Sequence, residues 1–171
     1  YKVENQPYIH YRKGSLVFYR LREEMGEEAL NRALKKFLEA KTYQQAPYTT
    51  SAELLDFIRA EARPDQQALI TDLFEKISFY DNRVEAATAK KRADGKYEVT
   101  LKLHAAKRYA DGKGRESAGK LDDWVDVGVF ARGKSGEERD EKVLYLQRQR
   151  VTTENPTVTM VVDGMPYEAG F

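Results

Sequence analysis

The sequence contains no cysteine, only two histidines and no excess of charge of either sign. Without cysteine the chain can form no disulfide, no thiolate metal site and no cysteine nucleophile. The sequence therefore does not indicate whether the protein resides in an oxidising or a reducing compartment. Its 29 Lys and Arg residues are balanced by 28 Asp and Glu residues, so the net charge is +1. A charge this small gives no long-range attraction for phosphate backbones or anionic lipids, which argues against nucleic-acid binding and against general binding to membrane surfaces.

Long apolar runs are also missing. No run approaches the ~20 residues of a membrane span, and no signal-peptide pattern opens the sequence. The chain has 171 residues, of which 41% are hydrophobic and 33% charged, as in ordinary globular proteins. Because it begins with Tyr1 rather than Met and ends at Phe171 without a terminal signal, we expect it to be an excised piece of a longer protein.

The composition of the chain changes near residue 80. Residues 1–80 contain two glycines, nine leucines and two valines, whereas residues 81–171 contain nine glycines, five leucines and ten valines. Charge does not distinguish the halves, so the change is one of secondary structure. We therefore predict an α+β fold with two domains, a helical one over residues 1–79 and an all-β one over residues 80–171.

The first domain has apolar residues at helical spacing, which predicts an antiparallel bundle of about four helices. The first helix is predicted to end at Gly26, because glycine often terminates helices. Thr50 and Glu53 have the spacing of a capping box that opens the third helix. Pro64 is expected to end the third helix or to begin the fourth. The four apolar stripes cover residues 17–25, 30–38, 54–62 and 69–77.

The second domain has apolar and polar residues in alternation, which predicts five or more short antiparallel strands in an immunoglobulin-like β-sandwich. The clearest run covers residues 97–105, and the preceding Asp94 and Gly95 predict a hairpin turn from a strand over residues 84–91. The glycine-rich stretches 111–119 and 133–136 are interpreted as hairpin loops. Further alternating runs begin at residues 125, 144 and 158.

Few residues suit metal or hydrolytic chemistry. His10 and His104 have no second histidine at helical or strand spacing, and the zinc motif His-Glu-x-x-His, the Gly-x-Ser-x-Gly elbow and the phosphate loop are all absent. Three acidic residues cluster beside a tryptophan, namely Asp122, Asp123 and Asp126. They leave open a calcium site or acid/base catalysis of glycoside hydrolysis, although solvation of a strand edge explains them more simply. Two short basic groups, at residues 90–92 and 148–150, are interpreted as a solvated sheet face.

The N-terminal segment carries the most specific pattern. Residues 7–17 read Pro-Tyr-Ile-His-Tyr-Arg-Lys-Gly-Ser-Leu-Val. This stretch resembles the segment Tyr-Glu-Lys-Gly-(Ala/Ser)-x-(Val/Leu) of the aminopeptidase N-like zinc metallopeptidases. In that family a tyrosine three residues before the glycine points its hydroxyl at the zinc-bound substrate carbonyl, and the resemblance places this catalytic tyrosine at Tyr11. Arg12 departs from the glutamate of many relatives, but the role of the tyrosine does not depend on that position.

The resemblance extends over most of residues 1–80. Gly26-Glu27-Glu28 between two helices looks like the family's Leu-Gly-Glu-Glu loop, and residues 49–57 and 72–74 look like the helices that close its catalytic domain. The β-rich remainder occupies the position of the family's β-sandwich domain. These likenesses imply the C-terminal part of a bacterial-type zinc metallopeptidase whose full-length parent removes residues from the amino end of peptides.

Because the zinc motif is absent, the resemblance implies a piece that is inactive alone, holds no cofactor and contributes to a parent that binds zinc upstream of Tyr1. The expected partners are the rest of its own catalytic domain and, in the parent, a peptide substrate. No nucleic acid is expected as a partner. Membrane contact is expected only through possible upstream segments. The parent is expected to be a bacterial protein that is either membrane-anchored or cytoplasmic. Two alternatives stay open: a non-enzymatic protein-binding or structural module, and a parent that keeps the fold without its zinc ligands.

Overall fold

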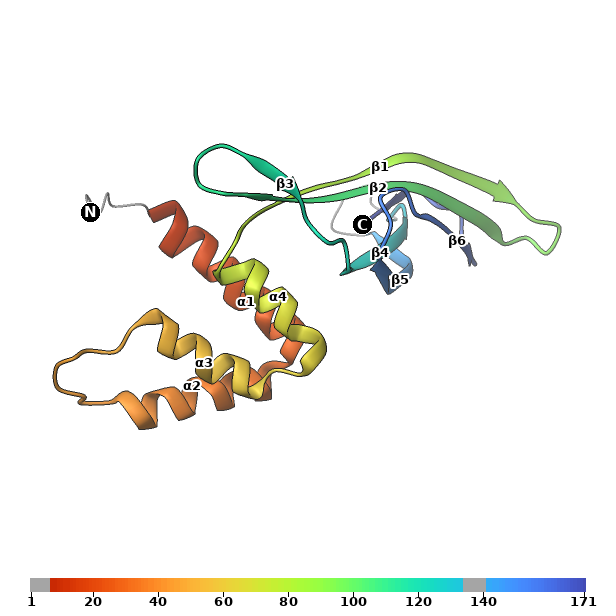
Figure 1. Cartoon of the computed structure of the whole chain (residues 1–171). Helices are drawn as coiled ribbons and strands as arrows, with labels where there is room; N and C mark the ends of the chain where they lie inside the picture. The colour runs from red at the N-terminus through yellow and green to blue at the C-terminus, as the bar shows by residue number, and fades with distance from the viewer. Residues whose placement is uncertain (1–6, 134–140) are drawn as a thin grey trace. The chain divides into compact units, whose positions relative to one another are not determined.

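The structure, a computed structural model, describes residues 7–133 and 141–171. The chain divides into two compact units, Tyr1–Lys76 and Ile77–Phe171, each with its own hydrophobic core. The regular elements of the first unit are helices and those of the second are strands, so the fold is of the α+β class (Figure 1). The boundary predicted from composition, between residues 79 and 80, lies slightly later in the chain than the boundary between the two units.

The first unit begins with a π-helical segment that continues directly into an α-helix. Gly26 then separates the first two helices with a φ of 84°, a left-handed conformation that glycine adopts without steric cost. The third helix opens with the predicted capping box, in which Thr50 N–H donates to Glu53 Oε2 at 2.8 Å and Thr50 Oγ1 accepts from Glu53 N–H. The elements are η1 (Tyr8–Lys13), α1 (Gly14–Met25), α2 (Glu27–Lys41), α3 (Ser51–Glu61), η2 (Pro64–Gln66) and α4 (Gln67–Phe74).

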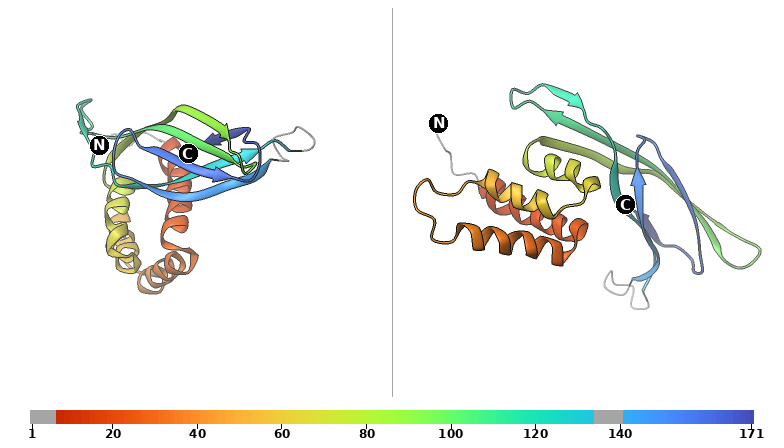
Figure 2. Two further views of the ribbon diagram at one scale, coloured as in Figure 1. Left: turned by 90° about the vertical axis from the view of Figure 1, so that its right-hand side faces the viewer. Right: turned by 60° about the horizontal axis from the view of Figure 1, so that its bottom comes forward.

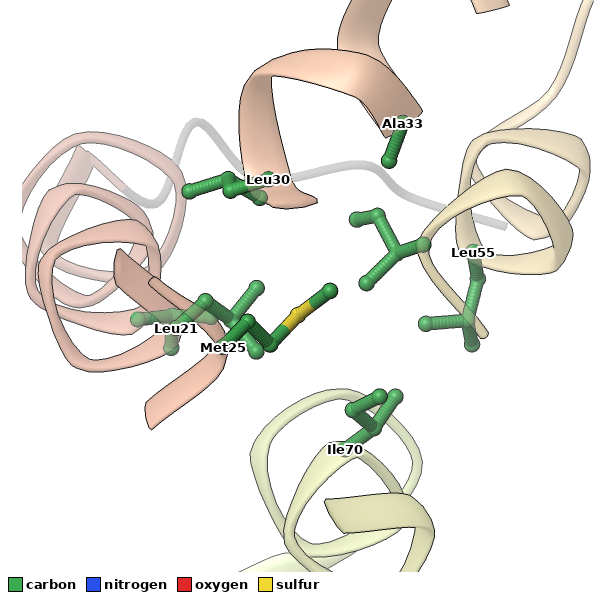
Figure 3. Packing of buried hydrophobic residues seen from close by; sticks show 8 residues of the cluster. Leu21, Met25, Leu30, Ala33, Leu55 and Ile70 are labelled. Carbon is green, nitrogen blue, oxygen red and sulfur yellow. The ribbon is translucent and has the colours of Figure 1, made fainter. Parts of the chain in front are cut away.

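One core joins the four α-helices. Side chains from all of them converge on a common centre, as Figure 3 shows. Because these residues lie on one stripe of each helix, burying them removes the apolar face of every helix from water. The buried residues of this core are Val17, Leu21, Met25, Leu30, Ala33, Leu55, Ile58 and Ile70.

The predicted fourth helix was too long. Its apolar stripe was extended to Ile77, but α4 ends at Phe74 and Ile77 is the first residue of a strand. The spacing from Phe74 to Ile77 fits a helix as well as it fits a short linker, so periodicity alone could not separate the two.

The second unit contains seven strands among its described residues, arranged in two antiparallel sheets. In the first sheet β2 pairs with β1 on one side and with β3 and β6 on the other, and in the second β4 lies between β5 and β7. The long hairpin of β1 and β2 turns at Asp94 and Gly95 as predicted, with a φ of 83° at the glycine (Figure 2). The strands are β1 (Ile77–Lys91), β2 (Tyr97–Ala110), β3 (Glu116–Ala118), β4 (Asp123–Ala131), β5 (Lys142–Val151), β6 (Thr157–Val162) and β7 (Glu168–Gly170).

Both sheets contribute to the second core. In β2 the buried residues alternate with more exposed ones, as the sequence pattern predicted. Two short strands were not predicted: β3 lies in a stretch that was interpreted as a loop, and β7 has only three residues. The predicted loop at residues 133–136 lies almost wholly outside the described residues. The buried residues of this core are Val99, Leu101, Leu103, Val127, Val129, Met160 and Val162.

Candidate functional site

Tyr11 lies in the π-helical turn η1, immediately before α1. π-Helical turns are rare and are frequently found at functional sites. The Tyr11 side chain is 74% exposed, so its phenol is not sealed in the core of the helical unit. The structure thus places the predicted catalytic residue on the surface, at the head of a regular helix.

Hydrogen bonds hold the backbone around Tyr11. Ser15 Oγ donates to the carbonyl oxygens of Tyr11 at 2.8 Å and of Arg12 at 3.0 Å. The Gly14 N–H donates to the carbonyls of Ile9 and Tyr11. The Ser15 hydroxyl therefore adds side-chain hydrogen bonds to backbone bonds that already run within the helix at the junction of η1 and α1. Tyr11 is therefore carried by a defined element rather than by a loose terminus.

Gly14 does not serve a close backbone approach among the described residues. Its φ of −57° is that of an ordinary helix, and a Cβ at this position would lie 3.8 Å from its nearest neighbour, the Ile9 carbonyl oxygen. This distance is a normal van der Waals contact. The described residues therefore leave room for a small side chain at position 14.

Helix α1 has apolar residues on two faces. Its buried face contributes Val17, Leu21 and Met25 to the core of the helical unit. On its exposed surface it carries Leu16, which is 69% exposed, and Tyr19, and the preceding turn adds Tyr8 and Ile9. An ordinary surface helix keeps one apolar stripe, toward the core. We call Tyr8, Ile9, Leu16 and Tyr19 the outer apolar face of η1 and α1.

The histidines do not form a metal centre in the described part of the chain. His104 is only 20% exposed, with Nδ1 3.3 Å from Asn155 Oδ1 and Nε2 3.5 Å from Asp81 Oδ2. Neighbouring polar side chains therefore contact both nitrogens of its ring. His10 belongs to η1, and its side chain lies outside what the structure describes. No group of three or more metal-binding side chains converges within residues 7–133 and 141–171.

The acidic residues near Trp124 pair with arginine and lysine side chains of their own unit. Asp122 accepts two hydrogen bonds from the Arg150 guanidinium, at 2.6 and 3.0 Å, and these bonds lower the pKa of its carboxyl group. Asp123 pairs with Lys107 at 2.8 Å. Asp126 lies opposite Arg148 in the ladder of β4 and β5, and the Arg148 guanidinium lies 6.0 Å from the centre of the Trp124 ring. This arrangement supports neither a calcium site nor a pair of catalytic carboxylates, since cations already neutralise the first two acids.

A polar hollow on the first sheet was not predicted. It measures about 220 Å³, and β2, β3 and Glu154 contribute to its wall. Its charged residues include Arg108 and Glu116, which pair with each other at 3.4 Å. No sequence signal could have identified it, because Glu154 lies far along the chain from the other lining residues. Lys107, which also lines the hollow, pairs with Asp123 in turn.

None of the helices in the described ranges has both the length and the apolar character that crossing a membrane requires. Comparison of the chain with known protein families, with curated proteins and with solved structures finds no match.

Proposed function

We propose that this chain is the C-terminal part of a bacterial-type, aminopeptidase N-like zinc metallopeptidase, with Tyr11 as a catalytic residue of the complete enzyme. The observation that carries the proposal is the placement of Tyr11, three residues before Gly14 in the family's motif, exposed in a π-helical turn that leads into a helix. A tyrosine in that motif with its phenol buried in the helical core could not reach a substrate.

The proposed role follows from the charge that develops during peptide hydrolysis. Attack of water on a peptide carbonyl places negative charge on the carbonyl oxygen, and a phenol O–H donates a stronger hydrogen bond to that oxyanion than to the neutral carbonyl. Zinc, bound by residues of the parent upstream of Tyr1, would supply the activated water. Tyr11 would donate the hydrogen bond from a rigid helix end, so that little reorganisation is needed during the reaction.

The remaining elements are assigned supporting roles. The helical unit is proposed to be an antiparallel four-helix bundle that closes the catalytic domain, and the all-β unit an immunoglobulin-like sandwich that braces it or walls the substrate cleft. The common core of the four helices and the shared core of the two sheets support these assignments. The outer apolar face of η1 and α1 is proposed to pack against the preceding part of the catalytic domain.

A second candidate is a non-enzymatic module that binds another protein. It is favoured by exposed apolar residues on β4 and β5, namely Trp124, Val143 and Leu146. Exposed apolar residues that cluster often mark protein interaction sites. The sequence that precedes Tyr1 in the parent distinguishes the two candidates: a His-Glu-x-x-His motif followed by a glutamate about one helix further on supports the peptidase, and its absence supports the module.

The decisive variant is Tyr11→Phe in the full-length protein, which removes only the phenol oxygen. We expect peptide turnover to fall by about 100- to 1,000-fold, because loss of one oxyanion donor typically has that effect. Zinc content, measured by metal analysis, should not change. Tyr48→Phe is the matched control, since Tyr48 is also exposed but lies in the connection between α2 and α3. Unchanged turnover in Tyr11→Phe would remove Tyr11 from the mechanism.

A further inference from the structure

Lys107 is a buried cation that the proposed function does not use. It lies on the face of β2 that carries Leu101, Leu103 and Ala105, and its side chain is only 4% exposed. A buried ammonium group needs a partner, because removal of an unpaired charge from water is strongly unfavourable. Its partner is Asp123, whose Oδ1 lies 2.8 Å from Lys107 Nζ and whose side chain is 16% exposed.

The ion pair joins the two sheets of the all-β unit. Lys107 belongs to β2 in the four-stranded sheet, and Asp123 is the first residue of β4 in the three-stranded sheet. Residues 119–122 carry the chain from one sheet to the other and end directly at Asp123. The pair therefore lies at the corner where the chain changes sheets.

Neighbouring residues are shaped to fit Lys107 into this corner. Its Nζ lies 5.4 Å from the centre of the Tyr80 ring, which is within the range of a cation–π interaction. The Gly119 N–H donates to the Lys107 carbonyl at 2.8 Å. A Cβ at position 119 would lie 2.8 Å from Lys107 Cγ, closer than real Cβ contacts allow. The stem of the lysine thus occupies space that only a glycine leaves free.

The buried residues of the core between the sheets are apolar, and burial of apolar groups has little directional preference. Several packings of two sheets can exclude water about equally well, whereas a hydrogen-bonded ion pair is satisfied in one geometry. Buried ion pairs often add little net stability, because the cost of desolvation offsets their attraction. We propose that Lys107 and Asp123 form a polar clasp. The role of this clasp is to select one arrangement of the two sheets, and it adds little to the net stability of the unit.

The test compares Lys107→Met, Asp123→Leu and the double variant in the full 171-residue chain. Urea unfolding is followed by the amide peaks of β2 and β4 in proton–nitrogen correlation spectra. Each single variant removes the oppositely charged member of the ion pair from a largely buried charge, so we expect the folding equilibrium constant to fall by roughly 100- to 1,000-fold. The double variant should lie within about tenfold of the unaltered chain. Its amide peaks in β2, residues 119–122 and β4 should broaden or double, because several packings become populated.

The matched control is Arg150→Met combined with Asp122→Leu. This pair lies at the same corner, but its side chains are much more exposed than those of the polar clasp. We expect it to keep one set of peaks and a similar unfolding midpoint. A double variant of the polar clasp with a single set of sharp peaks would overturn the proposal. So would a double variant that is unfolded or as unstable as the single variants, and so would single variants as stable as the unaltered chain.

Discussion

At the scale of single residues, Glu53 links helix stability to pH. Its carboxylate accepts hydrogen bonds from Lys41, from the Thr50 backbone and from Thr49, and these bonds lower its pKa from 4.5 to about 2. Because the folded-state pKa is the lower one, the carboxylate contributes stability above about pH 4.5, and this contribution is lost as the pH falls toward 2. We expect Glu53→Gln to lower the melting temperature of the helical unit at pH 7 and to have almost no effect at pH 2.

The measurement is thermal unfolding by circular dichroism at 222 nm, a signal to which the helices contribute most. Glu39→Gln is the control, because Glu39 faces Lys35 across 3.8 Å on the exposed side of α2 and takes no part in a helix cap. A Glu53→Gln difference of the same size at pH 7 and pH 2 would contradict the proposed linkage. A difference that grows as the pH falls would contradict it as well.

Some residues were predictable from local spacing, and others depended on distant partners. Thr50 and Glu53 were predicted as a capping box, because the pattern spans only four positions and its hydrogen bonds are local. The predicted alternating run covered residues 97–105 and left out Lys107, and a lysine is normally exposed. Its burial is made possible by Asp123 and Gly119, which contact it from beyond the next turn. Contacts of this kind are set by the folded chain and leave no trace in spacing.

At the scale of elements, the sequence pattern predicted the buried face of α1 but not the π-helical turn that precedes it. Val17, Leu21 and Met25 were predicted as one face, and they are buried. Tyr11 was predicted from its motif, and the structure places it on the surface in a π-helical turn that no periodicity indicated. The three-residue strands β3 and β7 were missed for a related reason, since three residues are too few to show a period.

The outer apolar face of η1 and α1 predicts different effects of one substitution in two contexts. In this chain Leu16 is largely exposed, so Leu16→Asp should change the free energy of unfolding by no more than about 0.5 kcal/mol. In the full-length protein the same change should lower the melting temperature, because a charge would be buried where the preceding part of the catalytic domain packs. Val17→Asp, on the buried face, should unfold the helical unit in either context. Equal effects of Leu16→Asp in both proteins would show that nothing covers this face.

At the scale of the whole molecule, the two cores predict two separate unfolding units. Ile58 is fully buried in the core of the helices and Leu101 in the core of the sheets, and neither core includes residues of the other unit. Replacing either residue by alanine removes buried methyl groups and leaves a cavity, which typically costs about 2–5 kcal/mol. We expect Ile58→Ala to destabilise only Tyr1–Lys76 and Leu101→Ala only Ile77–Phe171. Hydrogen exchange measured peptide by peptide distinguishes the outcomes, because each variant should speed exchange in its own unit alone. If either variant speeds exchange equally throughout the chain, the two units unfold together as one cooperative block.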